Sequence, residues 1–146
     1  MPSQEPLDAD LAKLKASAGA YPIEALHFVQ SGFSHAAKSV QKRHQQLAQE
    51  GVGQLAQDDR HLSGQQLCFG LLDYAIDQYG MLAPVVLRRW NVQRTDDFGR
   101  IVFGLIELGV LRKSPTDSID DFRSVYEFDE VFATDVLRRK LLESRG

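Results

Sequence analysis

The chain has 146 residues and a net charge of −3, with 43% hydrophobic and 25% charged residues, as is ordinary for one globular domain. This balance excludes a global basic field that would draw the protein to nucleic acid or anionic lipid. A single cysteine, Cys68, excludes an intrachain disulfide, and no apolar run reaches the roughly 20 residues that span a bilayer. Residues 1–10 lack the regions of a secretory signal, so we expect a cytoplasmic protein without a membrane partner.

Two helices are predicted at the start of the chain. Leucines at spacings of four and three indicate a short amphipathic helix over residues 7–14. Pro22 suits the first turn of a second helix, whose apolar pattern thins past Lys42. The sequence therefore predicts N-terminal helices within residues 1–44. Residues 45–60, rich in Gln and mixed charge, are interpreted as a poorly packed connector.

Two further helices have clear ends. Ser63 and Gln66 have the spacing of a capping box, and Gly80 suits the left-handed position after the apolar stripe that follows. Pro84 is placed to open a short helix that ends near Asn91.

The next helix starts at Thr95, the expected N-cap. Asp96 and Asp97 lie in its first turn, where they match the helix dipole, and Gly109 ends it. Replacing both aspartates by Asn is expected to lower stability by about 1 kcal/mol or less. The predicted apolar face consists of Phe98, Ile101, Val102, Leu105 and Ile106.

A β-hairpin is predicted directly after this helix. Residues 110–113 are expected to form a short strand, 114–117 a turn, and 122–128 a returning strand rich in aromatic and β-branched side chains. Asp129 is the expected cap of a last helix that runs to Glu143.

The order helix, short helix, tight turn, helix, strand, turn, strand resembles a winged helix-turn-helix. We predict a mainly α protein with a small β-hairpin, in which an N-terminal helix pair precedes a winged helix-turn-helix-like unit with a C-terminal helix over residues 61–146. The alternative is a five-helix bundle with an incidental hairpin.

Short segments over most of the chain resemble a family of uncharacterised, conserved hypothetical proteins of planctomycetes and verrucomicrobia. The resemblance implies a bacterial cytoplasmic protein and supplies no catalytic residues. The segments include His61-Leu62-Ser63-Gly64, Tyr74-Ala75-Ile76, Arg89-Trp90, Thr95-Asp96-Asp97-Phe98-Gly99 and Tyr126-Glu127-Phe128.

Enzymatic chemistry has weak support in the sequence. Glu24 and His27 have the spacing of one carboxylate-bridged di-iron ligand pair, but such sites need a second copy. His27 and His35 would be about 12 Å apart on a straight helix, too far to share a metal. Cys68 is expected to be a small buried hydrophobe. We predict no catalytic residue, no cofactor and no metal ion.

DNA binding is the second candidate function. A helix-turn-helix presents the first turns of its recognition helix to base edges, and here those turns carry two aspartates. Residues 82–128 contain seven basic and seven acidic residues, so the unit has no net positive charge to supply affinity for DNA. Nucleic acid is therefore a disfavoured partner. Its candidate contacts are Arg88, Arg89, Arg94 and Arg100.

The leading hypothesis is a non-enzymatic protein-binding adaptor or regulatory module. Phe103 and Gly104 fall largely off the apolar face of their helix, with Arg100 and Glu107 nearby, and an exposed aromatic beside a glycine allows close approach of another chain. The alternative buries Phe103 under the N-terminal helices. The partner is a protein that the sequence does not identify, and homo-oligomerisation is left open.

Overall fold

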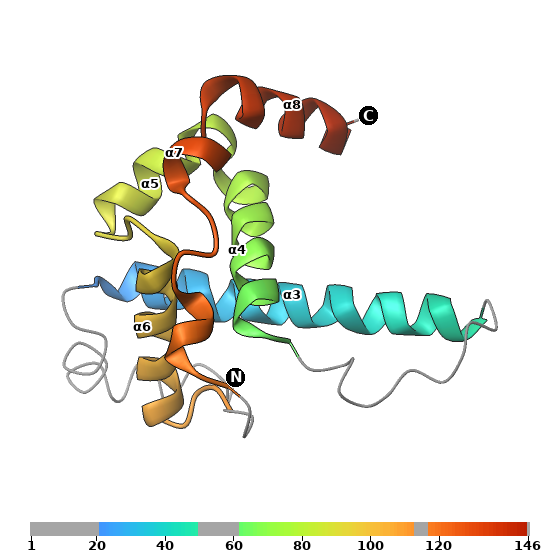
Figure 1. Cartoon of the computed structure of the whole chain (residues 1–146), viewed down its shortest axis with the longest axis vertical. Helices are drawn as coiled ribbons and strands as arrows, with labels where there is room; N and C mark the ends of the chain where they lie inside the picture. Colours follow the sequence, from blue (N-terminus) through green and yellow to red (C-terminus); the bar gives the residue numbers. More distant parts are fainter. Residues whose placement is uncertain (1–20, 50–61, 113–116, 146) are drawn as a thin grey trace.

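The computed structural model describes residues 21–49, 62–112 and 117–145. The helix predicted over residues 7–14 lies outside this part of the chain. Three long helices form the frame: α3 (Ile23–Gln49), α4 (Gly64–Tyr79) and α6 (Thr95–Glu107). Figure 1 shows α4 and α6 both crossing α3, with the segment around η3 (Ile119–Phe122) running between them.

The remaining helices are shorter and lie toward the end of α4 that is farther from α3 (Figure 1). A 3₁₀ turn, η2 (Gly80–Leu82), leads into α5 (Ala83–Arg89). The chain closes with α7 (Phe128–Val131) and α8 (Thr134–Arg145), and α8 packs against η2 (Figure 1). Within the described residues, no helix combines the length and the apolar character needed to cross a bilayer.

One hydrophobic core joins these elements. Its fully buried large side chains come from α3, α4, α5, α6 and α8, so the first long helix and the C-terminal half share an interior. They include Leu26, Val29, Leu71, Leu87, Phe98, Ile101, Leu105 and Leu137.

Several predicted helix ends are confirmed. The Ser63 hydroxyl accepts the Gln66 amide at 3.1 Å, while the Gln66 side chain accepts the Ser63 amide at 3.0 Å. Gly80 and Gly109 follow α4 and α6 with positive φ angles of 56° and 77°, a conformation that glycine adopts without strain. A proline stands in the first turn of α5, as expected.

The predicted β-hairpin is wrong. Among the described residues there is no strand, and residues 122–128 contain the end of η3, a bend and the start of α7. The backbone donors that a hairpin needs are used elsewhere: the amides of Val110 and Leu111 both bond to the Leu105 carbonyl, at 2.9 and 3.3 Å. Phe122, placed in the return strand, is buried instead. The described structure therefore gives no winged unit, while the mainly α prediction is confirmed.

Two other boundaries differ from the predictions. α3 continues to Gln49, so the first part of the predicted connector 45–60 is helical, and its remainder lies outside the described residues. The last helix is broken between α7 and α8. The chain turns there so that Phe132 packs edge-on against Phe128, with ring centroids 5.4 Å apart, while Leu137 also reaches the core.

Candidate functional site

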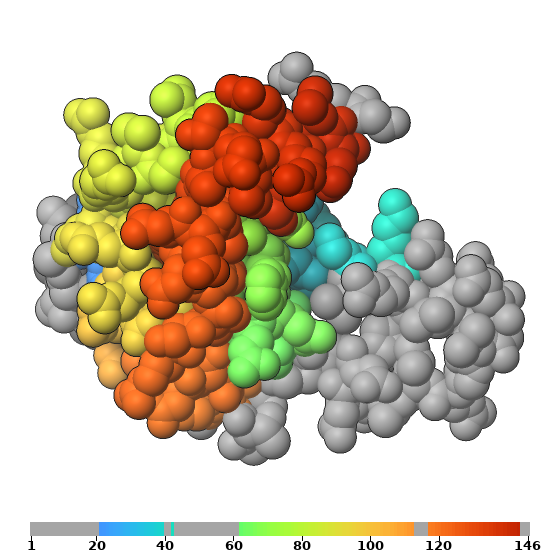
Figure 2. All heavy atoms as spheres, turned by 45° about the horizontal axis from the view of Figure 1, so that its top comes forward, coloured from blue at the N-terminus to red at the C-terminus, as the bar shows by residue number. Residues whose placement is uncertain are grey.

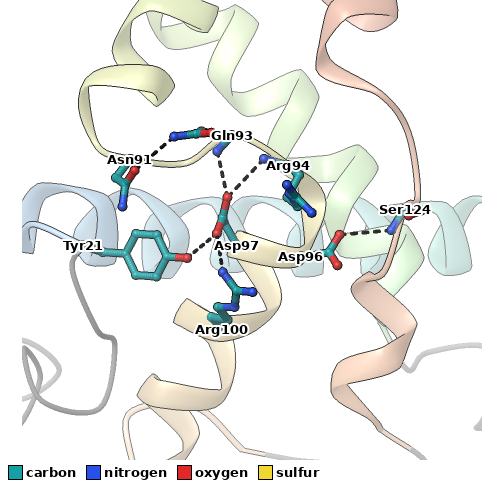
Figure 3. Close-up of polar contacts among 8 residues, drawn as sticks. All are labelled: Tyr21, Asn91, Gln93, Arg94, Asp96, Asp97, Arg100 and Ser124. Atoms are coloured by element: carbon teal, nitrogen blue, oxygen red, sulfur yellow. Dashed lines mark hydrogen bonds and ion pairs between the residues drawn. The ribbon is translucent and has the colours of Figure 1, made fainter.

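The start of α6 is a buried polar junction centred on Asp97. One carboxylate oxygen accepts hydrogen bonds from the Tyr21 hydroxyl and, at 3.0 Å, from the Arg100 guanidinium. The other accepts the backbone amides of Gln93 at 2.8 Å and Arg94 at 3.1 Å (Figure 3). The aspartate thus ties the entry to α3, the loop before α6 and α6 itself, and its two oxygens are occupied by four donors.

Thr95 and Asp96 tie the segment before α7 to the same junction. The Thr95 hydroxyl accepts the Val125 amide at 3.0 Å, and the Asp96 carboxylate accepts the Ser124 amide at 3.2 Å. The Thr95 cap is therefore wrong: its side chain binds a distant segment, and Asp97 takes the amides at the helix start. These bonds also explain why the predicted return strand does not form. The amides of Ser124 and Val125 already donate to side chains of α6, so they are not available to a partner strand.

The junction changes the electrostatic argument about DNA. The predicted acidic recognition end assumed two aspartates facing a polyanion, but Asp97 is buried and Asp96 is half-buried. Burial argues against sequence-specific DNA binding more strongly than charge does. The helix α6 is buried on most of its circumference and packs against α3, α4 and η3. A recognition helix must present an exposed face to the major groove. On α6 only Arg100 and Glu107 are fully exposed.

The predicted interaction surface is split by the fold. Arg100 and Glu107 are exposed, whereas Gly104 is buried and Phe103 is half-buried, with its ring edge-on to Phe122 at a centroid distance of 6.3 Å. The pocket beside Phe103 has a volume of about 20 Å³, enough for roughly one water molecule. Phe103 of α6 packs against η3, and the space left beside it is too small for a ligand.

The four candidate nucleic-acid arginines are all exposed, but they do not form one set. Arg100 is held by Asp97 at the junction. Arg88 and Arg89 lie in the last turn of α5, and Arg94 lies in the loop before α6. These three make no ion pair with any other residue that the structure describes.

The most exposed apolar side chains near these arginines belong to η2 and α5. Met81 is 43% exposed, Leu82 63% and Val85 56%. The consecutive apolar residues Val85, Val86 and Leu87 cannot all face one side of α5, because successive helical positions point about 100° apart. Leu87 takes the core position with 1% exposure, which leaves Val85 outside. The run of three apolar residues therefore indicates that one of them is exposed on the surface.

A groove separates α5 from α7. It has a volume of about 510 Å³ and combines apolar side chains with one cation, one amide and one carboxylate. Figure 2 shows this side of the molecule, with α5 in yellow-green beside the orange-red α7. The lining residues are Pro84, Arg88, Val92, Gln93, Phe128, Asp129 and Phe132. We use "α5 face" for Met81, Leu82, Val85, Arg88 and Arg89 together with this groove.

Two side chains of the described interior, Cys68 and Tyr126, have raised pKa values. Burial raises the pKa of the Cys68 thiol to about 12, so it stays protonated and unreactive at neutral pH. Burial also raises the pKa of Tyr126, whose hydroxyl donates to the Cys68 carbonyl at 2.7 Å. In the described part of the chain, no three His, Cys, Asp or Glu side chains gather as a metal site would need.

Comparisons with protein-family models, with curated proteins and with solved structures find no match to this chain.

Proposed function

We propose that this protein is a non-enzymatic, cytoplasmic protein-binding module, an adaptor or regulator, and that its contact surface is the α5 face. The observation that carries the proposal is the group of exposed apolar side chains on η2 and α5, Met81, Leu82 and Val85. Pro84 and Arg88 of the same helix line the 510 Å³ groove. Adjoining exposed apolar side chains are typical of protein contact sites.

The energetics of the α5 face fit a binding surface. Leu82 and Val85 are 63% and 56% exposed, so burying what remains of each contributes about 1–2 kcal/mol of transfer free energy, before the cost of association. Arginine is enriched among the residues that dominate binding energies, and Arg88 lines the groove itself. A surface that combines these features gains free energy when a partner covers it.

DNA binding is the second candidate, and one observation favours it: Arg88, Arg89 and Arg94 are exposed and unpaired within the described residues. Such cations would contact DNA phosphates without recognising a base sequence, because the buried α6 cannot enter the major groove of DNA. Duplex affinity at physiological salt is therefore expected to be no better than roughly 10⁻⁴ M, the weak end of non-specific binding.

A tagged pull-down from native cells tests the function, with nuclease added to one half of each sample. We compare the unmodified protein, the double variant Leu82→Asp with Val85→Asp, and the control Leu142→Asp. Leu142 is 67% exposed on α8, so the control adds the same charge at an unrelated exposed apolar position.

The proposal expects one or more proteins to be captured in both nuclease arms, kept by the α8 control and lost by the α5 double variant. Captured material that disappears with nuclease would favour DNA binding. Capture that the α5 double variant retains would overturn the assignment of this surface.

A further inference from the structure

The α5 face has a polarity along its length. Its apolar side chains, Leu82 and Val85, lie at the start, and Arg88 and Arg89 lie in the last turn. From Val85 to Arg89 the rise along the helix is about 6 Å, at 1.5 Å per residue. Leu82, Val85 and Arg89 follow the three-and-four spacing that places residues along one side of a helix. A partner therefore meets an apolar end and a cationic end.

The two arginines have no carboxylate of their own. Neither forms an ion pair with another described residue, and the sequence of η2 and α5 contains no acidic side chain. Asp129 is the one acid in the groove lining, and it belongs to the opposite wall, on α7. The cationic charge of the α5 wall is thus available to a carboxylate brought by a partner.

This charge pattern argues against a second copy of the chain as the occupant. Two α5 faces paired antiparallel would place each arginine pair against the apolar start of the other α5. No acid of η2 or α5 would balance either pair. Burying an arginine without a carboxylate partner costs free energy. A symmetric dimer would incur that cost at the arginine pair of each copy.

We infer that the α5 face receives an acidic amphipathic helix that lies antiparallel to α5, an inference that rests on the proposed function. Acidic side chains in the first turn of the partner would pair with Arg88 and Arg89. Apolar side chains at spacings of three and four would cover Leu82 and Val85. The antiparallel direction also sets the positive end of the partner's dipole beside the negative C-terminal end of α5.

Selection from a displayed library of random 14-residue peptides tests the chemistry of the occupant. The unmodified protein is the bait, and the variant with Leu82→Asp and Val85→Asp removes peptides that bind elsewhere. We expect the surviving peptides to carry Asp or Glu one turn before apolar residues at helical spacing. Their affinity is then measured by fluorescence anisotropy.

Charge reversal supplies the decisive comparison. Arg88→Glu with Arg89→Glu is expected to weaken the selected peptides about tenfold or more, the combined effect of two exposed ion pairs. The matched control reverses Arg138 and Arg139, two adjacent exposed arginines on α8, and should leave affinity within about twofold. A second selection on the α5 charge-reversed protein should yield Lys and Arg in place of the acids.

Three results would overturn the inference: no peptide enriched over the counter-selection, enriched peptides without acidic bias, or an equal loss in the α8 control. A dimer of the unmodified protein that Leu82→Asp converts to monomer, measured by light scattering, would identify a second copy as the occupant and also overturn it. If the pull-down still captures a partner through the α5 face, the proposed function stands while this inference fails.

Discussion

The start of α6 and the α5 face are neighbours in the chain, yet they use charge in opposite ways. At the junction, Asp97 is buried and its oxygens are occupied by four donors from three parts of the chain. On α5, Arg88 and Arg89 are exposed without an ionic partner in the described structure, beside apolar side chains. The first arrangement stabilises the fold, and the second leaves interactions for another molecule.

The difference shows why the type of a charged residue does not reveal its role. From the sequence alone, an acidic pair at the start of a helix predicts a surface that repels phosphate and a cost of about 1 kcal/mol or less for replacing both residues. Burial and four hydrogen bonds instead make Asp97 part of the interior, so its removal should cost more. The partners of a charge, and whether water reaches it, decide between stability and recognition.

The largest expected effect is at Asp97. Asp97→Ala removes the acceptor of four hydrogen bonds and leaves the Tyr21 hydroxyl buried without this partner, so we expect a loss of about 3 kcal/mol or more in the free energy of unfolding. Urea unfolding followed by Trp90 fluorescence measures it. The control Asp96→Ala removes one hydrogen bond and should cost about 1 kcal/mol. Equal losses for the two would contradict the distinction between a buried and a half-buried acid.

The contact between α6 and η3 gives the next effect. A Cβ atom added at Gly99 would lie 2.8 Å from Cβ and 2.9 Å from Cγ of Phe122, closer than side chains approach. Gly99→Ala should therefore lower stability by about 1–3 kcal/mol in the same assay, through overpacking. Phe122→Gly, which removes both Cβ and Cγ, should relieve the clash when combined with it, so that the double variant loses less than the sum of the two single losses. Additive losses would show that η3 does not pack on α6.

Alkaline pH should weaken the junction. Burial and the hydrogen bond to Asp97 raise the pKa of Tyr21 to about 12 from its ordinary value of 10. The unfolded chain therefore releases this proton first, and the stabilisation that is complete below pH 10 is lost as pH rises through about 12. The loss from this group should be at most about 2.7 kcal/mol, because the pKa rises from 10 to about 12. Unfolding from pH 8 to 12 checks this. Tyr21→Phe should show a shallower decline, and an unchanged slope would contradict the assignment.

The smallest effect on stability is expected on the α5 face. Leu82→Asp and Val85→Asp replace side chains that are more than half exposed, so each should change the free energy of unfolding by no more than about 0.5 kcal/mol. The same urea assay measures this, with Leu87→Asp as the contrast, since Leu87 is 1% exposed and its replacement should be severely destabilising. A large loss at Leu82 would show that this side chain supports the fold.

Local sequence signals predicted the elements that rest on local physics. The Ser63–Gln66 capping box, the proline of α5 and the glycines after α4 and α6 act within a few residues, and the structure confirms them. The hairpin failed because its outcome depends on distant partners: the amides of Ser124 and Val125 bond to side chains 28 and 30 residues earlier. No local preference of residues 122–128 encodes that choice.

The candidate site was predictable only in part. Exposure of Arg88 and Arg89 follows from their place in the last turn of an amphipathic helix, and it was expected. The groove could not be foreseen, since it arises where the broken last helix sets α7 opposite α5. The sequence left open whether Phe103 is exposed or buried under the N-terminal helices, and the structure places it half-buried with its ring against Phe122 of η3. The family resemblance stays a prediction.

Hydrogen exchange of the free protein and of its complex with a selected peptide distinguishes recognition at the α5 face from the structural role of the start of α6. We expect slower exchange on binding over residues 80–93 and 128–132, with residues 95–107 unchanged, because α6 is already buried. Slower exchange confined to residues 95–107, with none in α5, would contradict it.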